Sequence, residues 1–478
     1  MKSFLLAMLA LVAGYLLSYP PVDDAYITFR YAENLARGHG MVYNSGENIL
    51  GVTTPLWALF LGAGAHFGIA PSILANLLPA LVAVLTFWLL ARIFLQPSIG
   101  SAALLLPSAA LLYFPVMVAV FSGMETTIYI GTSCGAIIAA VKRRPYLAGG
   151  LCAASCMLRP DGVLALIVVS IIFAKESWPH LVRSLSIAAL LLAPWMAYAT
   201  LTYGSPVPQS IYAKRLLYPE PPGRIFLMIF EGLTQTVPDL VLIVGGLAGI
   251  LFLARRNGSI GYLLLWEALY VAGLSFSGVR PIFYWYFTPL IAITAVLGWG
   301  GLALLYKERF PAHFTARRIT WVISLLCLGL LGNSVYRSQQ TDPGQVREQA
   351  YRQILRDYGG AIPARARVLL GETGILGYGL GDNYIFDSSG LNSALPFKII
   401  SSARAELADR NMPFGDINRE TSWAIKLVQE SDPDWIIAPR GRLQLAVMEE
   451  QSWFRDRFER LALYAPEQAL GIGVYRRR

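Results

Sequence analysis

The stretch SILANLLPALVAVLTFWLLARIFL, residues 72–95, decides the class of this protein. Only one charged side chain, that of Arg92, interrupts it. At about 1.5 Å of rise per residue, a helix of this length crosses a hydrocarbon core about 30 Å thick. The composition agrees, because 55% of the chain is hydrophobic, only 14% is charged and the mean hydropathy is +0.51. The sequence therefore predicts a polytopic membrane protein and excludes a water-soluble fold.

Further apolar runs are long enough, or nearly long enough, to cross a membrane. The first, residues 3–19, has no small-x-small cleavage site before Pro20, so we predict a transmembrane helix there rather than a removed signal peptide. Residues 54–68 form a shorter apolar run, for which we predict a re-entrant or interfacial helix. About eleven crossings result, at residues 3–19, 72–95, 101–120, 125–141, 146–158, 162–174, 184–202, 238–254, 259–274, 284–306 and 319–336.

Basic side chains orient these runs, since cytoplasmic loops are enriched in Lys and Arg. A topology consistent with these basic residues places three regions on the outer side of a bacterial plasma membrane: residues 20–53, residues 203–225 and the C-terminal region. The formal charge of +9 then comes from short runs at helix ends rather than from one basic face, which argues against nucleic acid as a partner. The clusters assigned to the cytoplasm are Lys2, Arg92, Lys142 to Arg144, Lys175 with Arg183, Arg255 with Arg256, and residues 307–318.

The composition changes near Arg337, where charge density rises and the apolar runs become short. Runs typical of buried strands alternate with polar stretches typical of helices: strands at 368–370, 384–386 and 435–437, and helices around 344–358, 419–430 and 444–460. We therefore predict a membrane all-α bundle of about eleven transmembrane helices at residues 1–336, followed by a small extracytoplasmic α/β domain at residues 337–478.

A pair of carboxylates, Asp23 and Asp24, opens the first external loop, residues 20–53. Two adjacent acids beside a low-dielectric membrane are expected to have at least one raised pKa, which suits a general base. The plain alternative is that Asp24 caps the helix predicted at residues 25–37, which ends at Gly38 with suitable chemistry. That helix carries charges on one stripe and apolar side chains on another, as a helix lying in the membrane interface does.

The stretch DDAYITFRYAENLARGHG, residues 23–40, resembles the first external loop of GT-C membrane glycosyltransferases, in particular the terminal arabinofuranosyltransferases of mycobacteria. Shorter motifs extend the resemblance over most of the chain, although the membrane spans match only in pattern. They are SGMET at 122–126, RPDG at 159–162, PQSIYAK at 208–214, GETG at 371–374, LGY at 376–378 and DSSGL at 387–391. The chain departs from the family at Asp161, where the family has Glu, at Glu372, where relatives often have Asp, and in a shorter C-terminal domain.

The resemblance implies a GT-C fold and a glycosyltransferase that takes D-arabinofuranose from a polyprenyl-phosphate donor to an external glycan or glycoprotein acceptor. GT-C proteins keep an acidic residue in this loop as catalytic base or ion ligand, so it also implies that Asp23 and Asp24 are catalytic. We favour Asp24, because it opens the helix. Two alternatives stay open: a hexose or aminoarabinose donor on the same fold, and a lipid-linked sugar flippase. A flippase predicts inverted repeats, which we do not detect in the sequence.

The chemistry of a lipid-linked sugar agrees with these residues. A glycosyl phosphate leaves as a stable anion, so the enzyme needs a base for the incoming hydroxyl and cations for the phosphate. The residues predicted to bind the donor phosphate or sugar are Arg30, Glu125, Arg159, Lys214, Arg280 and Tyr284, and Glu372 is predicted to bind the acceptor. The plain alternatives are an ion pair between Glu125 and Arg159, an interfacial aromatic belt around Tyr284 and a simple turn at Glu372.

A divalent cation is the one cofactor that the residues suggest, since Asp23, Asp24 and Glu125 offer oxygen ligands. The four cysteines all fall in apolar stretches, so we expect neither a disulfide nor a thiolate metal site. His39 and His66 have no partner at metal-ligand spacing.

Overall fold

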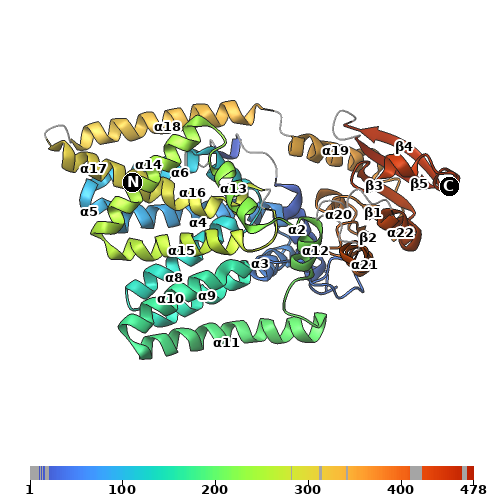
Figure 1. Cartoon of the computed structure of the whole chain (residues 1–478), viewed down its shortest axis with the longest axis horizontal. Coiled ribbons are helices and arrows are strands. Elements are labelled where there is room, and N and C mark those ends of the chain that lie inside the picture. The colour runs from blue at the N-terminus through green and yellow to red at the C-terminus, as the bar shows by residue number, and fades with distance from the viewer. Residues whose placement is uncertain are drawn as a thin grey trace. The chain divides into compact units, whose positions relative to one another are not determined.

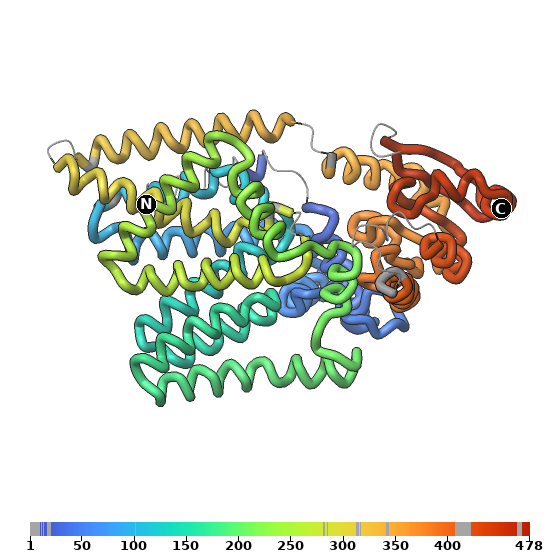
Figure 2. The backbone as a smooth tube through the Cα atoms, viewed as in Figure 1, coloured from blue at the N-terminus to red at the C-terminus, as the bar shows by residue number. Residues whose placement is uncertain are grey.

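The computed structural model describes residues 10, 12, 14–16, 21–280, 283–311, 315–340, 343–409, 422–465 and 471–478. The chain forms two compact units, whose path is traced in Figure 2. The helical unit consists of Met1–Pro21, Ser72–Pro194 and Pro221–Gln340, and the α/β unit of Val22–Pro71, Trp195–Glu220 and Thr341–Arg478. Two loops predicted to flank membrane helices thus fold with the C-terminal segment, so the units do not follow the division at residue 336 that the sequence suggests.

Helices make up the helical unit (Figure 1). Its α-helices are α4 (Pro71–Leu90), α5 (Gln96–Ile99), α6 (Leu106–Leu112), α7 (Phe114–Phe121), α8 (Thr126–Val141), α9 (Pro145–Leu158), α10 (Val163–Glu176), α11 (Trp178–Tyr203, in this unit up to Pro194), α13 (Pro222–Leu233), α14 (Val237–Arg256), α15 (Gly258–Ser275), α16 (Thr288–Ile293), α17 (Trp299–Arg309) and α18 (Ala316–Ser338). Five shorter helical turns connect them: η1 (Ala91–Leu95), η2 (Gly100–Leu105), η3 (Pro160–Gly162), η4 (Tyr284–Tyr286) and η5 (Thr294–Gly298).

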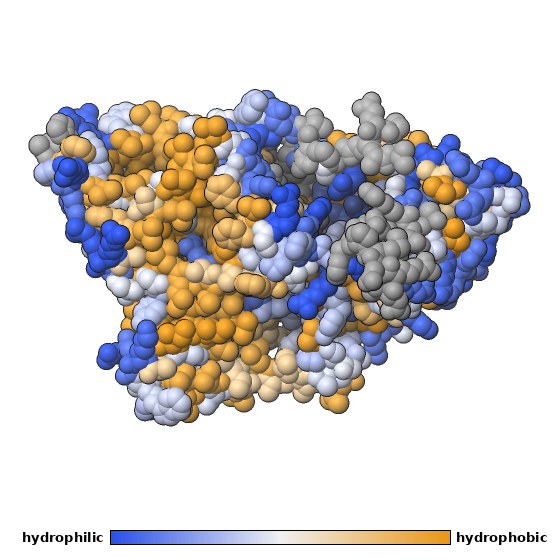
Figure 3. All heavy atoms as spheres, viewed as in Figure 1, coloured by the Kyte–Doolittle hydropathy of each residue, from blue (hydrophilic) through white to orange (hydrophobic). Residues whose placement is uncertain are grey.

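Membrane-length helices are present, as the sequence predicts. Among the described residues five helices are long and apolar enough to cross a membrane, or six if the pair α6 and α7, bent by 72°, is one span. The five are Pro71–Ile99, Trp178–Tyr203, Val237–Arg256, Thr288–Arg309 and Arg317–Ser338. On the face shown in Figure 3, hydrophobic side chains cover much of the helical unit, as expected of a surface that faces lipid. Most of the apolar run 3–19 lies outside the described residues, and the count of eleven crossings stays a prediction.

Small residues let two of these helices pack backbone to backbone. A Cβ atom added at Gly249 of α14 would overlap the main-chain oxygen of Gly298, and one added at Gly301 of α17 would overlap that of Gly249. In a membrane, where lipid is as apolar as Leu, such close van der Waals packing is a main source of helix association.

The α/β unit is built on a five-stranded mixed sheet with strand order β2-β1-β3-β5-β4. β1 pairs in parallel with both β2 and β3, whereas β5 pairs antiparallel with β3 and β4. The strands are β1 (Arg367–Leu370), β2 (Tyr384–Asp387), β3 (Trp435–Pro439), β4 (Phe458–Tyr464) and β5 (Ile472–Arg477). The helices are α2 (Asp23–Ala36), α3 (Pro55–His66), α12 (Gln209–Leu217), α19 (Pro343–Tyr358), α20 (Ile375–Gly379), α21 (Ala394–Asp409), α22 (Ser422–Ser431), α23 (Leu445–Met448) and α24 (Ser452–Arg457).

Successive side chains along a strand point to opposite faces of the sheet, and here a hydrophobic core forms on each face. Val368 and Leu370 of β1 point into one core, which also contains Tyr31 and Tyr43 of the first external loop. Leu369, between them, points into the other core with residues of α21 and α22. The first external loop is therefore part of the α/β unit. The apolar side of α2, including the fully buried Ala25, Phe29 and Ala32, faces protein rather than lipid, and a position of this helix at the membrane interface stays a prediction.

The predicted strands at 368–370, 384–386 and 435–437 are confirmed, as is the helix at 344–358. The helix predicted at 444–460 is wrong, because the segment breaks into α23 and α24 and enters β4 at Phe458. Gln444, the N-cap of α23, adopts the left-handed conformation with φ 51°. Toward the end of the segment, pairing of β4 with β5 outweighs the helix propensity. The helix predicted around 419–430 is confirmed from Ser422 onward, since residues 419–421 lie outside the described part.

Candidate active site

Three parallel strands bring polar residues from distant parts of the chain to one edge of the sheet. Glu372 follows β1, Asp387 ends β2, and Arg442 follows β3. Because β1, β2 and β3 are parallel, their carboxyl ends lie at the same edge, which is where open α/β sheets bind ligands. Asp24 lies within electrostatic range of all three of these side chains.

Asp23 holds the loop after β1 in place. Its Oδ1 accepts a hydrogen bond from the main-chain N–H of Ile375 at 2.8 Å, and its Oδ2 accepts one from Gly374 at 3.2 Å. A Cβ atom at residue 374 would overlap the main-chain carbonyl of Asp23, so only glycine allows this approach. Burial and the nearby Glu372 carboxylate raise the pKa of Asp23 well above its usual range. Both oxygens of Asp23 thus fix the loop after β1, and its predicted catalytic role stays a prediction.

Asp24 is arranged differently. Helix α2 begins at Asp23 with Val22 as N-cap and no capping side chain, so the prediction that Asp24 caps this helix is wrong. Within the described residues the Asp24 carboxylate forms no hydrogen bond or ion pair, and its residue is only partly buried. Desolvation by the surrounding protein raises its pKa; the cations of Lys214 and Arg442 oppose this, and the Glu372 carboxylate adds to it. A carboxylate with a raised pKa and open oxygens suits a general base.

Glu372 and Arg442 form the ionic part of the site. Arg442 Nη1 donates to Glu372 Oε1 at 3.4 Å, while Glu372 Oε2 accepts from the Tyr351 hydroxyl at 2.9 Å and lies 3.6 Å from Arg347 Nε. The Arg442 side chain is 26% exposed and that of Glu372 is 22% exposed, so both can contact a ligand from solution. The placement at a strand end suits the predicted role of Glu372 in acceptor binding, which stays a prediction.

Glu348 of α19 gives the site a pH-dependent stability. Its Oε1 accepts the main-chain N–H of Asp23 at 2.9 Å, and burial raises its pKa to about 7. A carboxyl whose pKa is raised on folding contributes stability that is present below about pH 4.5 and lost as the pH rises through 7, by at most about 3 kcal/mol. Glu348→Gln, which keeps the acceptor oxygen without the charge, is therefore expected to match the wild type at pH 5 and to melt at a higher temperature at pH 8. Equal melting temperatures at both values would contradict this assignment.

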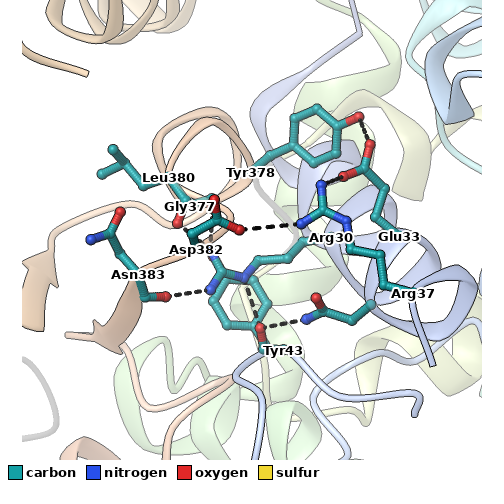
Figure 4. A network of polar contacts seen from close by, with 10 residues as sticks. Arg30, Glu33, Arg37, Tyr43, Gly377, Tyr378, Leu380, Asp382 and Asn383 are labelled. Atoms are coloured by element: carbon teal, nitrogen blue, oxygen red, sulfur yellow. Dashed lines mark hydrogen bonds and ion pairs between the residues drawn. The ribbon is translucent and has the colours of Figure 1, made fainter. Parts of the chain in front are cut away.

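Arg30 does not lie at this edge. Its five N–H groups all donate within the protein, to main-chain oxygens of Tyr43, Gly377, Leu380 and Asn383 and to the side chain of Asn44 (Figure 4). Only 3% of the residue is exposed. The predicted phosphate-binding role is not supported, because no N–H is left for a ligand; Arg30 instead joins α2 to the loop between α20 and β2.

A second polar cluster lies in the helical unit. Glu125 precedes α8 and Arg159 follows α9, and the packing of these two helices brings Arg159 Nη1 to 3.4 Å from Glu125 Oε1. Arg159 Nε also pairs with Asp161 at 3.0 Å, and its guanidinium lies over the rings of Tyr129 and Tyr286. The ion pair considered from the sequence is thus present. Glu125 Oε2 is buried and has no hydrogen-bond partner among the described residues, so a role in donor binding stays a prediction.

The remaining predicted residues fall in different places. Lys214 of α12 belongs to the α/β unit and lies within electrostatic range of Asp24, as a phosphate-binding cation would. Arg280 is exposed in the helical unit, and the Tyr284 side chain is outside the described part. The described residues contain no group of three His, Cys, Asp or Glu able to hold a metal, and Asp23 has both oxygens engaged.

Sequence reasoning missed Arg442 and the side chains that hold it, Tyr218 and Ser389. The sequence did contain information that could have located Arg442, because the strands at 368–370, 384–386 and 435–437 were predicted. Aligning them in parallel would have placed the residues that follow each one at a common edge.

Comparison with known proteins concerns the fold, which is similar to that of solved GT-C membrane glycosyltransferases. The chain covers 97% of ArnT from Cupriavidus metallidurans, crystallised with undecaprenyl phosphate, over 98% of its own length, with a TM-score of 0.62 and 12% identity. It also matches the oligosaccharyltransferase AglB of Archaeoglobus fulgidus, solved with an inhibitory peptide and a dolichol-phosphate, with a TM-score of 0.51 and 13% identity over 93% of this chain and 72% of that one.

In sequence the chain is similar to the terminal beta-(1->2)-arabinofuranosyltransferase of Mycobacterium tuberculosis, at 26% identity over 373 residues. The match spans 67% of this chain and 59% of that relative, so part of the relative has no counterpart in it. No protein-family model matches the chain. The resemblance predicted from residues 23–40 is confirmed, and the relatives and structural neighbours are glycosyltransferases.

Proposed function

We propose that this protein transfers a pentofuranosyl group, D-arabinofuranose, from a polyprenyl-phosphate donor to an extracytoplasmic glycan or glycoprotein acceptor, with Asp24 as the general base. The observation that carries the proposal is the Asp24 carboxylate, which has no hydrogen-bond partner within the described residues and lies within electrostatic range of the cations of Lys214 and Arg442. A base next to cations is the pairing that a glycosyl phosphate requires.

The proposed reaction needs one base and an anionic leaving group. The acceptor hydroxyl oxygen attacks the anomeric carbon and its proton passes to Asp24. The bond between that carbon and the phosphate oxygen breaks, and the electron pair leaves with the prenyl phosphate, which the cations stabilise. A single displacement inverts the anomeric configuration, whereas retention requires a carboxylate nucleophile, for which Glu372 is a candidate because it lies within electrostatic range of Asp24.

The proposed orientation places the α/β unit outside a bacterial plasma membrane. Basic helix ends gather at one end of the helical unit: Arg256 pairs with Glu308 at 2.6 Å, and Lys307 Nζ donates to the main-chain oxygen of Ser98 at 2.6 Å. Lys142 lines a cavity together with Asn257 at the same helix ends. This end would be cytoplasmic by the excess of Lys and Arg. Helix α8 runs from Glu125 to Lys142, so Glu125 lies toward the opposite end.

The test is an assay of purified protein with a panel of polyprenyl-phosphoryl pentoses and hexoses, followed by linkage analysis of the product. We expect transfer from the arabinofuranosyl donor at a rate at least ten times that from any hexosyl donor, since a pocket that hydrogen-bonds each hydroxyl of one sugar rejects others strongly. A preference for a hexose or aminoarabinose donor would overturn the sugar assignment. Movement of the intact lipid-linked donor from one leaflet of a vesicle membrane to the other, without transfer of its sugar, would instead favour a flippase.

A further inference from the structure

Arg442 has binding capacity that its contacts within the protein leave open. Its Nη1 donates to Glu372 at 3.4 Å, and its Nη2 donates to the Tyr218 hydroxyl at 3.0 Å and to the Ser389 hydroxyl. Within the described residues its Nε makes no hydrogen bond, and 26% of the side chain is exposed. The guanidinium is therefore fixed in orientation, while its Nε–H and one N–H of Nη1 stay available to a ligand.

Two other arginines of the α/β unit show the difference. Arg30 is buried and donates all five of its N–H groups to protein oxygens. Arg440, two residues before Arg442, pairs with Glu449, whose other oxygen accepts from Tyr475 and Arg460. Arg442 is instead held by two neutral hydroxyls, which fix its plane, and by a long contact of 3.4 Å with the Glu372 carboxylate.

We propose that Arg442, oriented by Tyr218 and Ser389, grips the phosphate of the prenyl-phosphate donor and of the prenyl phosphate that is released. This inference rests on the proposed function and names the donor-binding residue of the same site. Arg442 offers a phosphate two N–H groups in fixed directions, on Nε and Nη1, together with its positive charge, whereas a lysine such as Lys214 acts as a point charge. The site at the carboxyl ends of β1, β2 and β3 then has a base in Asp24 and an anion clamp in Arg442.

Binding the phosphate loosens the contact between Arg442 and Glu372. That contact is long, at 3.4 Å, so it is a weak hydrogen bond. Glu372 does not become unpaired, because it keeps the Tyr351 hydroxyl at 2.9 Å and the Arg347 cation at 3.6 Å. The exchange frees Glu372 Oε1 beside the arriving acceptor, which links donor binding to acceptor binding.

The experiment measures binding of a short-chain prenyl phosphate, and of the matching prenol, to the full-length protein in detergent. Arg442→Gln is expected to weaken prenyl-phosphate binding about 10- to 100-fold, since a hydrogen bond to a charged group is worth about 1.5–3 kcal/mol. Arg442→Lys should be intermediate, because it restores the charge but not the N–H groups held in fixed directions. Arg37→Gln, which alters an exposed arginine of α2, is the matched control and should bind like the wild type. Prenol binding should be the same in all four proteins.

Two results would overturn different claims. If Arg442→Gln binds prenyl phosphate as tightly as the wild type, the role of Arg442 is wrong and the proposed function stands. If the wild type does not distinguish prenyl phosphate from prenol, the phosphate donor itself is wrong. Should Arg442→Gln fail to fold, Tyr218→Phe decides the matter: it keeps the arginine, removes a hydroxyl that orients it, and should weaken prenyl-phosphate binding by about 3- to 10-fold. Unchanged binding by Tyr218→Phe would overturn the proposal.

Discussion

Asp24→Asn is expected to lower the rate of sugar transfer by a factor of about 10² to 10⁴ while the protein stays folded, because loss of a positioned base costs about that much. The substitution is nearly isosteric, and the Asp24 carboxylate has no hydrogen bond to lose within the described residues. The measurement is the initial rate with the best donor of the panel, alongside the melting temperature. An Asp24→Asn protein that turns over normally would remove Asp24 from the mechanism.

Asp23→Asn is the matched comparison, since it makes the same chemical change one residue away. An amide nitrogen cannot accept the N–H of Gly374 or Ile375, so one of these two bonds is lost. We expect a lower melting temperature and an activity loss that follows the folded fraction. A folded but inactive Asp23→Asn protein, together with an active Asp24→Asn protein, would exchange the two roles.

The pH profile provides an independent check on the base. The Asp24 carboxylate must be ionised to accept a proton, and desolvation raises its pKa above the ordinary value of about 3.9. The kcat/KM of the wild type should therefore fall as the pH is lowered through a value above 4. The residual rate of Asp24→Asn should not show this fall, because the titrating group is gone.

Local sequence signals predicted much of the fold. The apolar runs predicted membrane-length helices, and short apolar runs between turns predicted β1, β2 and β3. Pairing between distant segments was not visible: nothing near Val368 indicates that it lies beside Trp435, so the common edge that gathers Glu372 and Arg442 was missed. Strand β4 was taken for the end of a helix, because its partner β5 is what makes it a strand.

Contacts between distant segments also decide which of the predicted site residues lie together. The sequence does not show these contacts. Asp24, Lys214 and Glu372 were identified by residue type and family resemblance, and they lie within electrostatic range in one unit. Arg30 was assigned to the phosphate because it is one of the few cations in the predicted external loops. Periodicity shows which residues share a face but not whether that face meets water or protein, and here it meets the carbonyl oxygens of residues 377–383.

Arg30→Met is expected to destabilise the α/β unit by about 3–5 kcal/mol, since each buried polar atom left without its partner costs about 1–3 kcal/mol. The side chain is matched in length, so the loss comes mainly from the main-chain oxygens of Tyr43, Gly377, Leu380 and Asn383, which would be left without their donor. Arg30→Lys should fall in between, because an ammonium group has three donors for five acceptors. Thermal unfolding and protease digestion of the α/β unit measure the effect.

Arg37→Met is the control that distinguishes the hydrogen bonds of Arg30 from a general effect of removing a positive charge at α2. Arg37 lies two turns along the same helix, its side chain is 49% exposed, and its ion pairs with Glu33 and Asp382 are at 3.2 and 3.4 Å. Exposed ion pairs are worth about 0–1 kcal/mol, so this variant should melt close to the wild type. If both variants melt alike, Arg30 does not anchor α2 to the loop before β2. If only Arg30→Met loses stability, the arginine predicted to hold a donor phosphate instead holds the first external loop in the unit that carries Asp24.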